Sequence, residues 1–578
     1  MGKFALCIVI ASMIVTSPGI ARIINIPADY SSIQAGINAS LNDDTVLVQP
    51  GTFFEDIRFN GHNIVLGSMY IMTFDTSYIA ATIIDANSEP FGINFTGSEN
   101  SGAMVMGFTI QNAISFGIRC WIYSNPVLAN NIISGNGLGI LCFNSAATIQ
   151  KNIIRNNDGG GVACFDSSPQ IKNNIISENE SMQGGGISCI GSSPVIDSNL
   201  ISDNAAIEGG GIYFASNSQP VITANRILNN IGNGIFCTDG VDAIIKGNEI
   251  SGNSAEDGAG IFCQYSDVHI DSNYITRNDA IWNGGGIYCS DFMGDMTYNV
   301  IGSNSSGNGG GGIYCQDASP VIFNNLIVEN TDSIAGGGLY SVRSSPFLYN
   351  NVISHNRVIS QFEGRGGGVF IRDSELGACN SIFWADTAFQ GNEIYVFSGG
   401  TSFIACDVYG GWPGWGNIDV DPLFRDPDNG DYRLMATECG YPLSSPCIDA
   451  GGNRDAFLNC DWGLGTIWAD LGAYGGDITS LEIDDSNSKL PDQISISQNY
   501  PNPFNPTTTI QYDLPSPTDV TIEIFDIIGR RIEILINTRQ EAGHHQITWN
   551  ADDVPSGVYF YRIKAGEYSE TKKMLLLK

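Results

Sequence analysis

The sequence predicts an all-β protein built mainly as a right-handed parallel β-helix, and a repeat carries this prediction. Asparagines recur at intervals of 21 to 29 residues through much of the chain. Each repeat contains two short apolar runs bounded by Gly, Asn, Ser and Pro, which is typical of strands and tight turns. Because no repeat is long enough to bury a core alone, successive repeats are expected to stack as coils of one solenoid. The recurring asparagines are Asn131, Asn152, Asn174, Asn199, Asn225, Asn248, Asn273, Asn299, Asn325, Asn351 and Asn380.

The repeated asparagine is expected to form a ladder at one turn of every coil. Equivalent residues of neighbouring coils lie about 4.8 Å apart, so one side-chain amide can bond to the next coil. Asparagine also tolerates the left-handed conformation of a tight turn, whereas stacked aspartates would repel each other. Aliphatic pairs such as Ile132-Ile133 follow most of these asparagines and are expected to fill the interior.

The N-terminus has the pattern of a secretory signal peptide. Lys3 precedes an apolar stretch, Phe4–Thr16, that is too short to span a bilayer. Small residues at Gly19 and Ala21 predict cleavage after Ala21. No other stretch of the sequence is long and apolar enough to cross a membrane.

The charge of the chain excludes one class of partner. Its 578 residues carry a formal net charge of −34. Nucleic-acid binding needs Lys and Arg for phosphate contacts, so no nucleic-acid partner is expected. The acidity suits solubility outside the cell and the binding of cations.

Eight cysteines share one column of the repeat, in which Phe214 and Ser341 also occur. A column that accepts Phe is expected to pack inside the solenoid, so these cysteines are predicted to be free and buried. Cys439, Cys447 and Cys460 follow the solenoid, where one disulfide is a candidate. The column cysteines are Cys120, Cys142, Cys164, Cys189, Cys237, Cys263, Cys289 and Cys315.

Two segments that flank the repeats resemble parts of one known family. Residues 25–57 begin Asn-Ile-Pro-Ala-Asp-Tyr-Ser-Ser-Ile-Gln-Ala, and residues 421–476 include Asp-Pro-Leu-Phe and Ser-Ser-Pro-Cys-Ile-Asp-Ala-Gly. The first segment resembles the N-terminal cap of pectin-lyase-like β-helix proteins, and the second resembles the trailing segment of the same secreted family. Ser31 and Gln34 are expected to form a capping box for a short helix that closes the apolar stack.

The last 85 residues have a different pattern. Residues 498–506 read Gln-Asn-Tyr-Pro-Asn-Pro-Phe-Asn-Pro, and residues 556–562 read Ser-Gly-Val-Tyr-Phe-Tyr-Arg. Alternating runs between such turns predict a small immunoglobulin-like β-sandwich. The phrases resemble the type IX secretion sorting domain, which implies export by the type IX machinery and removal of this domain. The predicted organisation is a signal peptide at 1–21, a β-helix with its N-terminal cap at 22–398, a C-terminal cap region at 399–477, a linker at 478–493 and the sorting domain at 494–578.

The repeats lack the motifs of the polygalacturonases, although the fold alone decides nothing about function. That pattern needs Asn-Thr-Asp, Asp-Asp, Gly-His-Gly and Arg-Ile-Lys on neighbouring coils. Asn330-Thr331-Asp332 is present, but no Asp-Asp follows, Gly-His-Gly is absent, and Arg562-Ile563-Lys564 lies in the sorting domain. No catalytic residue is therefore assigned, and a lyase or hydrolase with a different site stays an alternative.

An aromatic column is the candidate binding site. It precedes the cysteine column on seven successive coils, between residues such as Ile287 and Cys289 that are expected inside. Strand alternation then points the rings outward, as a strip roughly 29 Å long. Exposed apolar strips mark interaction sites, and sugar rings stack on aromatic faces. The alternative is that the rings stabilise the sheet or are covered by the preceding loops. The column is Tyr213, Phe236, Phe262, Tyr288, Tyr314, Tyr340 and Phe370.

A second candidate site is acidic. Asp291, Asp317, Arg343 and Asp373 follow one another on successive coils, two residues beyond the cysteine column. Stacked carboxylates about 5 Å apart repel unless a cation or a proton intervenes, and their spacing resembles a retaining glycosidase pair. Neutralisation by Arg343, a calcium bridge and catalysis are the three explanations.

A third candidate would hold calcium, the one candidate cofactor. Asp426, Asp428 and Asp431 offer oxygen ligands at the spacing of a calcium loop. The glutamate that ends such loops is missing.

These observations predict a secreted protein of a bacterial cell surface that binds extended polysaccharide through the aromatic column. One alternative is a polysaccharide lyase or glycoside hydrolase of the pectin-lyase-like fold, and another is a non-catalytic adhesin or structural surface protein. The expected partners are an extracellular glycan and the type IX secretion machinery, and a monomer is expected.

Overall fold

The structure of the chain is a computed structural model that describes residues 21–452 except Met293, residues 470–474, and most of residues 494–576. The chain divides into two compact units, residues 1–480 and 481–578. This division falls inside the segment 478–493, which the sequence assigns to a linker.

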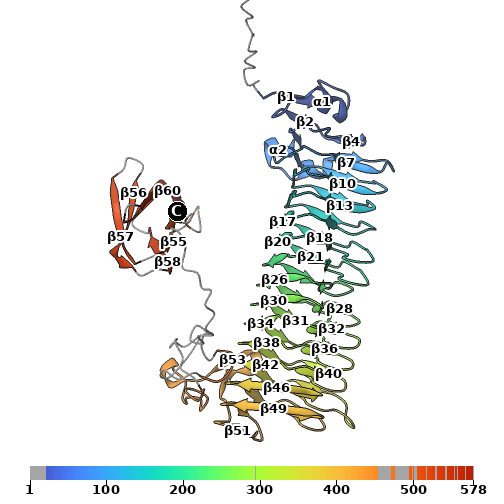
Figure 1. The fold of residues 1–578 in the computed structure, drawn as a ribbon. Coiled ribbons are helices and arrows are strands. Elements are labelled where there is room, and N and C mark those ends of the chain that lie inside the picture. Colours follow the sequence, from blue (N-terminus) through green and yellow to red (C-terminus); the bar gives the residue numbers. More distant parts are fainter. Residues whose placement is uncertain are drawn as a thin grey trace, which may run out of the picture. The chain divides into compact units, whose positions relative to one another are not determined.

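The first unit is a parallel β-helix, as predicted (Figure 1). Its coils stack into three long parallel sheets of 17, 15 and 14 strands, named sheets A, B and C, and a short sheet D of five strands. A typical coil passes through β11 (Val127–Ala129) in sheet A, β12 (Ile132–Ser134) in sheet B and β13 (Leu138–Phe143) in sheet C. Each strand pairs with its counterpart in the next coil, as Ile133 pairs with Ile154.

The predicted asparagine ladder lies at the corner between sheets A and B. Asn152 is representative: its backbone nitrogen and Nδ2 lie 2.9 and 3.1 Å from Asn174 Oδ1. The same Nδ2 also donates to the carbonyl oxygen of Leu128 at 2.9 Å. The ladder asparagines are buried, and an amide supplies both the donors and the acceptor that this corner needs. An aspartate would lack the donors.

Two details of the predicted ladder are wrong. Asn380 is not its last member, because the strand register places Ser381 opposite Asn351, whose N–H donates to Ser381 Oγ at 3.1 Å. The left-handed conformation also belongs to the residue before each ladder asparagine, such as Ala224 with φ of 52°. The corner therefore needs a left-handed residue followed by a buried amide.

A second asparagine ladder, which the sequence analysis missed, lies five residues further on, where the chain leaves sheet B. Its members bond in the same way; Asn157 Nδ2 lies 2.9 Å from Asn179 Oδ1. It ends at Asp386, whose Oδ1 accepts the backbone N–H of Asn356 at 2.7 Å. The same repeat period was the signal that could have revealed it. The members before Asp386 are Asn136, Asn157, Asn179, Asn204, Asn230, Asn253, Asn278, Asn304, Asn330 and Asn356.

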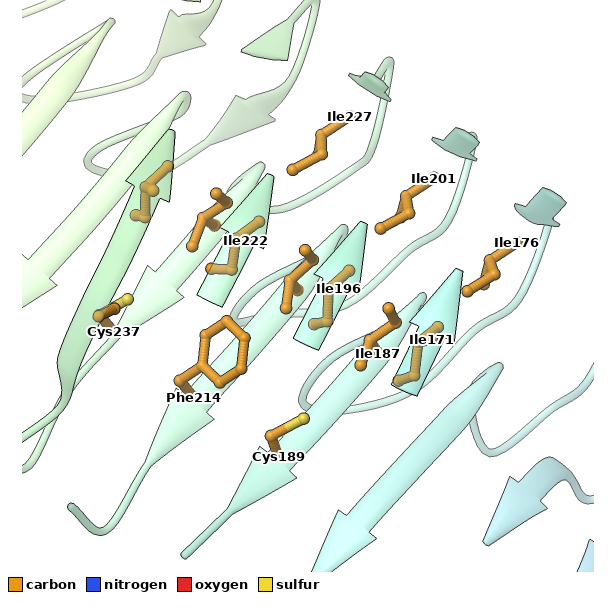
Figure 2. Close-up of a cluster of buried hydrophobic side chains, with 14 of the residues drawn as sticks. Ile171, Ile176, Ile187, Cys189, Ile196, Ile201, Phe214, Ile222, Ile227 and Cys237 are labelled. Carbon is orange, nitrogen blue, oxygen red and sulfur yellow. The ribbon is translucent and has the colours of Figure 1, made fainter. Parts of the chain in front are cut away.

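Inward-facing columns of aliphatic side chains fill the solenoid. Figure 2 shows Cys189, Phe214 and Cys237 in one interior column on sheet C. All eight column cysteines are free and fully buried, which confirms the prediction. After the solenoid, Cys439 is disulfide-bonded and Cys447 is free; Cys460 lies outside the described residues.

A short helix, α1 (Ile33–Ala39), lies over the first coils. Its N-cap is Ser32 rather than the predicted Ser31, because Ser32 Oγ accepts a backbone N–H of the first turn at 3.2 Å. The predicted role of Gln34 falls to Glu55, whose carboxylate accepts two backbone N–H groups of this turn at 2.9 Å each.

The parallel sheets continue past residue 398. β49 (Gly399–Ile404), β50 (Asp407–Val408) and β51 (Gly414–Trp415) extend sheets A and B. The chain then folds back as an antiparallel pair, β52 (Phe424–Asp426) and β53 (Asp431–Leu434), which packs on the outer face of sheet B. This cap segment, residues 424–434, is orange in Figure 1.

The second unit contains two antiparallel sheets, in agreement with the small β domain predicted. Its core includes Trp549 and Tyr561, and Tyr561 Oη accepts the backbone N–H of Asn499 at 2.8 Å. The described residues include no helix long and apolar enough to span a membrane. The strands are β54 (Ser495–Ile496), β55 (Thr507–Leu514) and β58 (Gly543–Asn550) in one sheet, and β57 (Arg531–Gln540), β56 (Thr518–Asp526), β59 (Gly557–Ala565) and β60 (Tyr568–Leu576) in the other.

Candidate functional site

The predicted aromatic column forms one continuous stack on sheet C. Centroids of successive rings lie 4.5 to 5.5 Å apart, and their planes differ by 1° to 29°. The stack continues to Tyr395, 5.8 Å from Phe370, which the sequence analysis missed. Tyr395 follows Ile394 as the other members follow inward aliphatic residues, and this pattern was the available signal.

The stack is not the open platform that the sequence predicts. Because the rings lie face to face, neighbouring rings cover each other's faces, and only the ring edges within the stack remain exposed. Tyr213, Phe236 and Phe370 are 5%, 9% and 4% exposed, and the other four predicted members are half-buried. Burial raises the pKa of Tyr288 to about 12. A sugar needs a free ring face for stacking, so the geometry supports the alternative in which the column stabilises sheet C.

Glycine-rich loops close over the column. Gly258 and Gly284 have φ of 58° and 65°, and a Cβ at either would lie 2.9 to 3.0 Å from the Cα of Phe262 or Tyr288. Only glycine meets both demands, the positive φ and the close approach. The glycine runs therefore let each loop fold against the following aromatic residue.

The acidic candidates do follow one another, at the corner between sheets C and A. Asp291, Asp317, Arg343 and Asp373 all have φ between 47° and 50°, which aspartate tolerates better than most residues. Arg343 binds Asp317 through two contacts of 2.8 and 2.7 Å, which lowers the pKa of Asp317. A glycosidase acid needs a raised pKa, so neutralisation by Arg343 is the explanation that the geometry supports.

Two of the three predicted calcium ligands have other partners. Asp431 is ion-paired with Arg433 at 2.8 Å, and Asp426 accepts a side-chain amide of Asn429 at 2.8 Å. In the described ranges, no group of three or more His, Cys, Asp or Glu side chains is placed to hold a metal ion. Calcium binding at Asp426, Asp428 and Asp431 stays a prediction that titration calorimetry can check.

The outer face of sheet B is open in its middle. At its N-terminal end, α3 (Ser77–Ala81) lies against β9 (Thr109–Gln111), where Thr109 Oγ1 donates to Ile79 O at 3.0 Å. From β12 to β31 (Tyr274–Thr276), the first outward residue of each strand is at least partly exposed. These seven residues are Ile132, Ile153, Ile175, Leu200, Arg226, Glu249 and Tyr274.

The cap segment closes the other end of this face. The outward residue of the next strand, Val300, is half-buried, and those of the three strands after it, Leu326, Val352 and Ile382, are 0–6% exposed because the cap segment packs on them. A cavity of about 520 Å³ lies where the open stretch meets the cap, within the usual size range of small-molecule sites. Its lining includes Tyr274, Arg277 and Glu329 from the solenoid and Asp428, Tyr432 and Tyr474 from the chain beyond it.

Carboxylates outnumber cations around this cavity. Glu249 is paired with Arg226 at 2.7 Å, and Glu329 accepts a hydrogen bond from Ser303 at 3.0 Å. Arg277 is the one cationic residue in the described lining. The cavity is therefore negative, like the whole chain.

Tyr432 forms part of the cavity wall, and its polar group is buried within that wall. The residue is 1% exposed, and its hydroxyl has no hydrogen-bond partner among the described residues. Burial, and then the charges of Glu329, Asp386 and Asp428, raise the pKa of Tyr432, so it stays a neutral donor at neutral pH. A buried hydroxyl without a partner costs about 1–3 kcal/mol, and this hydroxyl is enclosed in the cavity wall, out of reach of a ligand.

The comparisons with known proteins agree with this architecture. Residues 54–194 and 171–298 match the right handed beta helix region family, and residues 498–577 match the secretion system C-terminal sorting domain family. None of the curated proteins matches the chain.

Several solved structures are similar at low levels. The A-module of the Azotobacter vinelandii mannuronan C-5 epimerase AlgE6 is 12% identical, with 68% of this chain and 94% of that chain covered and a TM-score of 0.33. The catalytic domain of a GH87 alpha-1,3-glucanase is 14% identical, over 66% and 69%, with a TM-score of 0.28. The gp42 tailspike of Acinetobacter phage vb_AbaP_AS12 is 9% identical, over 90% and 77%, with a TM-score of 0.29. TM-scores this low support no conclusion about the function of this protein.

The chain is thus a right-handed parallel β-helix protein with a C-terminal type IX sorting domain. The sorting domain marks it as a type IX secreted protein of a bacterium, released or attached to the cell surface.

Proposed function

We propose that this secreted protein binds an extended polysaccharide on the open stretch of sheet B, and not on the aromatic column. The observation that carries the proposal is the cavity at the end of this stretch, where Tyr274 is 57% exposed. Its ring has no stacking partner among the described aromatic residues, unlike those of the sheet C column. Carboxylates beside an aromatic ring suit a sugar, because they accept hydrogen bonds from hydroxyl groups while the ring contacts the apolar face.

The shape of the open stretch suits a polymer. It spans seven strands from β12 to β31, and six steps of about 4.8 Å give roughly 29 Å. Exposed apolar side chains such as Ile175, 41% exposed, line the same column as Tyr274. An extended chain of several sugars can therefore lie along the solenoid axis.

A glycan array with the purified protein, followed by calorimetry, tests this proposal. Tyr274→Ser should weaken binding about fivefold to tenfold, since one aromatic contact contributes on the order of 1 kcal/mol. Tyr265 provides a matched control because it is also 57% exposed but lies outside sheet B. Tyr265→Ser should leave the affinity unchanged.

Three outcomes contradict the proposal. Unchanged affinity in Tyr274→Ser would move the site elsewhere. No binding to any glycan would favour the adhesive or structural alternative with a protein partner. Shortened or unsaturated products in mass spectrometry of the bound glycan would favour the enzyme.

A further inference from the structure

The open stretch of sheet B is closed at one end. A chain that lies along Ile175, Leu200 and Arg226 towards Tyr274 reaches the cap segment on the next coils. There the outward residues are covered by Phe424, Tyr432 and Leu434. The polymer cannot continue along sheet B, since that surface is already buried.

The far wall of the cavity is made by chain beyond the solenoid. The turn η1 (Pro427–Asn429) and Gly430 contribute the cavity residues Asp428, Asn429 and Gly430, and Tyr432 and Tyr474 complete the wall. The wall is anchored, because Tyr432 and Leu434 belong to the hydrophobic cluster that holds the cap on sheet B. It is thus a fixed stop and not a loose loop.

The chemistry of the cavity selects against an acidic sugar. Glu329 and Asp428 have no ion pair among the described residues, and Glu249 is already neutralised by Arg226. A sugar carboxylate placed there would meet like charges at short range, which Arg277 alone does not balance. Sugar hydroxyls can instead donate hydrogen bonds to the Glu329 and Asp428 carboxylates.

Building on the proposed glycan binding, we infer that the cavity between Tyr274 and the cap holds the terminal residue of an uncharged glycan chain. The protein then recognises chain ends, with the preceding sugars along sheet B. Only the end of a polymer can occupy the cavity, and its internal residues cannot. For polymers longer than the open stretch, affinity therefore follows the number of ends and not the length.

Oligosaccharides of two to eight residues from β-1,3-glucan, β-1,4-mannan, xylan and polygalacturonate provide the probes, with calorimetry as the readout. A linear β-1,3-glucan series is compared with a cyclic β-glucan, which has no ends, and each neutral series is also labelled at its reducing end with a bulky fluorophore. We expect at least one neutral series to bind and polygalacturonate to bind at least tenfold more weakly. The cyclic form should fail where the linear β-1,3-glucan series binds. If the reducing end occupies the cavity, the label abolishes binding. If the non-reducing end occupies the cavity, the label has no effect, and 4-O- or 3-O-methylation of the non-reducing end abolishes binding.

Variants separate the cavity from the open stretch. Asp428→Ala on the exposed turn should weaken neutral oligosaccharide binding severalfold, while Asp158→Ala, an exposed aspartate on a different loop, should not. Tyr474→Ala should let the labelled or methylated chains bind, with circular dichroism as the check of folding.

The outcomes distinguish this inference from the function beneath it. Equal binding of linear and cyclic glucan, or of chains blocked at either end, would overturn end recognition and leave glycan binding in place. Preference for polygalacturonate would overturn the assignment to an uncharged sugar. Failure of every probe to bind would overturn both the inference and the proposed function.

Discussion

Asp386 donates its backbone N–H to Glu393 Oε2 at 3.3 Å, and both carboxylic residues are buried, at 2% and 5% exposed. Asp386 is the last rung of a ladder whose earlier rungs are asparagines. Burial, then the neighbouring Glu393 charge, raises the pKa of Asp386 well above its usual value, and burial raises that of Glu393 to about 7. The ladder thus ends in a carboxyl pair that is easiest to bury when protonated.

This pair should make the protein less stable as the pH rises. Because both pKa values are higher in the folded state than in the unfolded state, folding takes up protons. The favourable contribution is present below about pH 4 and is lost as the pH rises through about 4 to 7. Asp386→Asn continues the asparagine ladder and should raise the free energy of unfolding at pH 7.5 by about 1–3 kcal/mol, with a smaller gain at pH 4.5. Urea unfolding at the two pH values measures this.

Asp317→Asn is the matched control for that experiment. Asp317 has a lowered pKa through Arg343, so its contribution is present at neutral pH and is lost as the pH falls. The control should give no gain at pH 7.5. A decrease in the stability of Asp386→Asn at pH 7.5 would contradict the explanation.

The asparagine ladder should be costly to interrupt. Asn225 Oδ1 accepts from the backbone N–H and Nδ2 of Asn199, and Asn225 Nδ2 donates to Asn248 Oδ1 at 3.0 Å. Asn225→Ala leaves buried donors without acceptors, so it should lower the free energy of unfolding by about 2–4 kcal/mol. The neighbouring Arg226→Gln breaks only an exposed ion pair and should cost at most about 1 kcal/mol. Equal losses in the two variants would show that the ladder has no special role.

The aromatic column should matter for stability and not for binding. Replacing Tyr288, Tyr314 and Tyr340 together by Ser removes stacked, half-buried rings. The thermal midpoint should fall by several degrees, since each lost contact contributes on the order of 1 kcal/mol. Thermal unfolding and calorimetry with a bound oligosaccharide measure the two effects. Unchanged stability with abolished glycan binding would restore the column as the binding site.

Export should process both ends of the chain. The signal-peptide pattern predicts a cut after Ala21, and the sorting domain predicts removal of the C-terminal unit near 478–493. Intact-mass analysis of protein from the native cell surface gives both ends at once. Mature protein that still carries Lys578 would contradict removal of the sorting domain.

The sequence predicts the fold because every coil of a solenoid repeats the same local structure. The structure confirms the period of the asparagines and the inward Ile and Cys columns, and the family match confirms the sorting domain. Asn380 was misplaced because the last coils differ in length, so the register there is set by strand pairing, as Ser381 opposite Asn351 shows. The sequence pattern assigns the second cap acceptor to Gln34, whereas Glu55, which is distant in sequence, supplies it.

The sequence by itself determined the parallel β-helix, its interior columns and its secretion domain, because stacking between equivalent residues follows from periodicity alone. Only the tertiary structure decided which outward face is open. Alternation places the aromatic column outside but does not show that its rings cover one another or that glycine loops close on it. It also does not bring the cap segment back onto sheet B, where Tyr432 meets the coil of Glu329 across about a hundred residues. Such contacts depend on the path of irregular chain, which no repeat encodes.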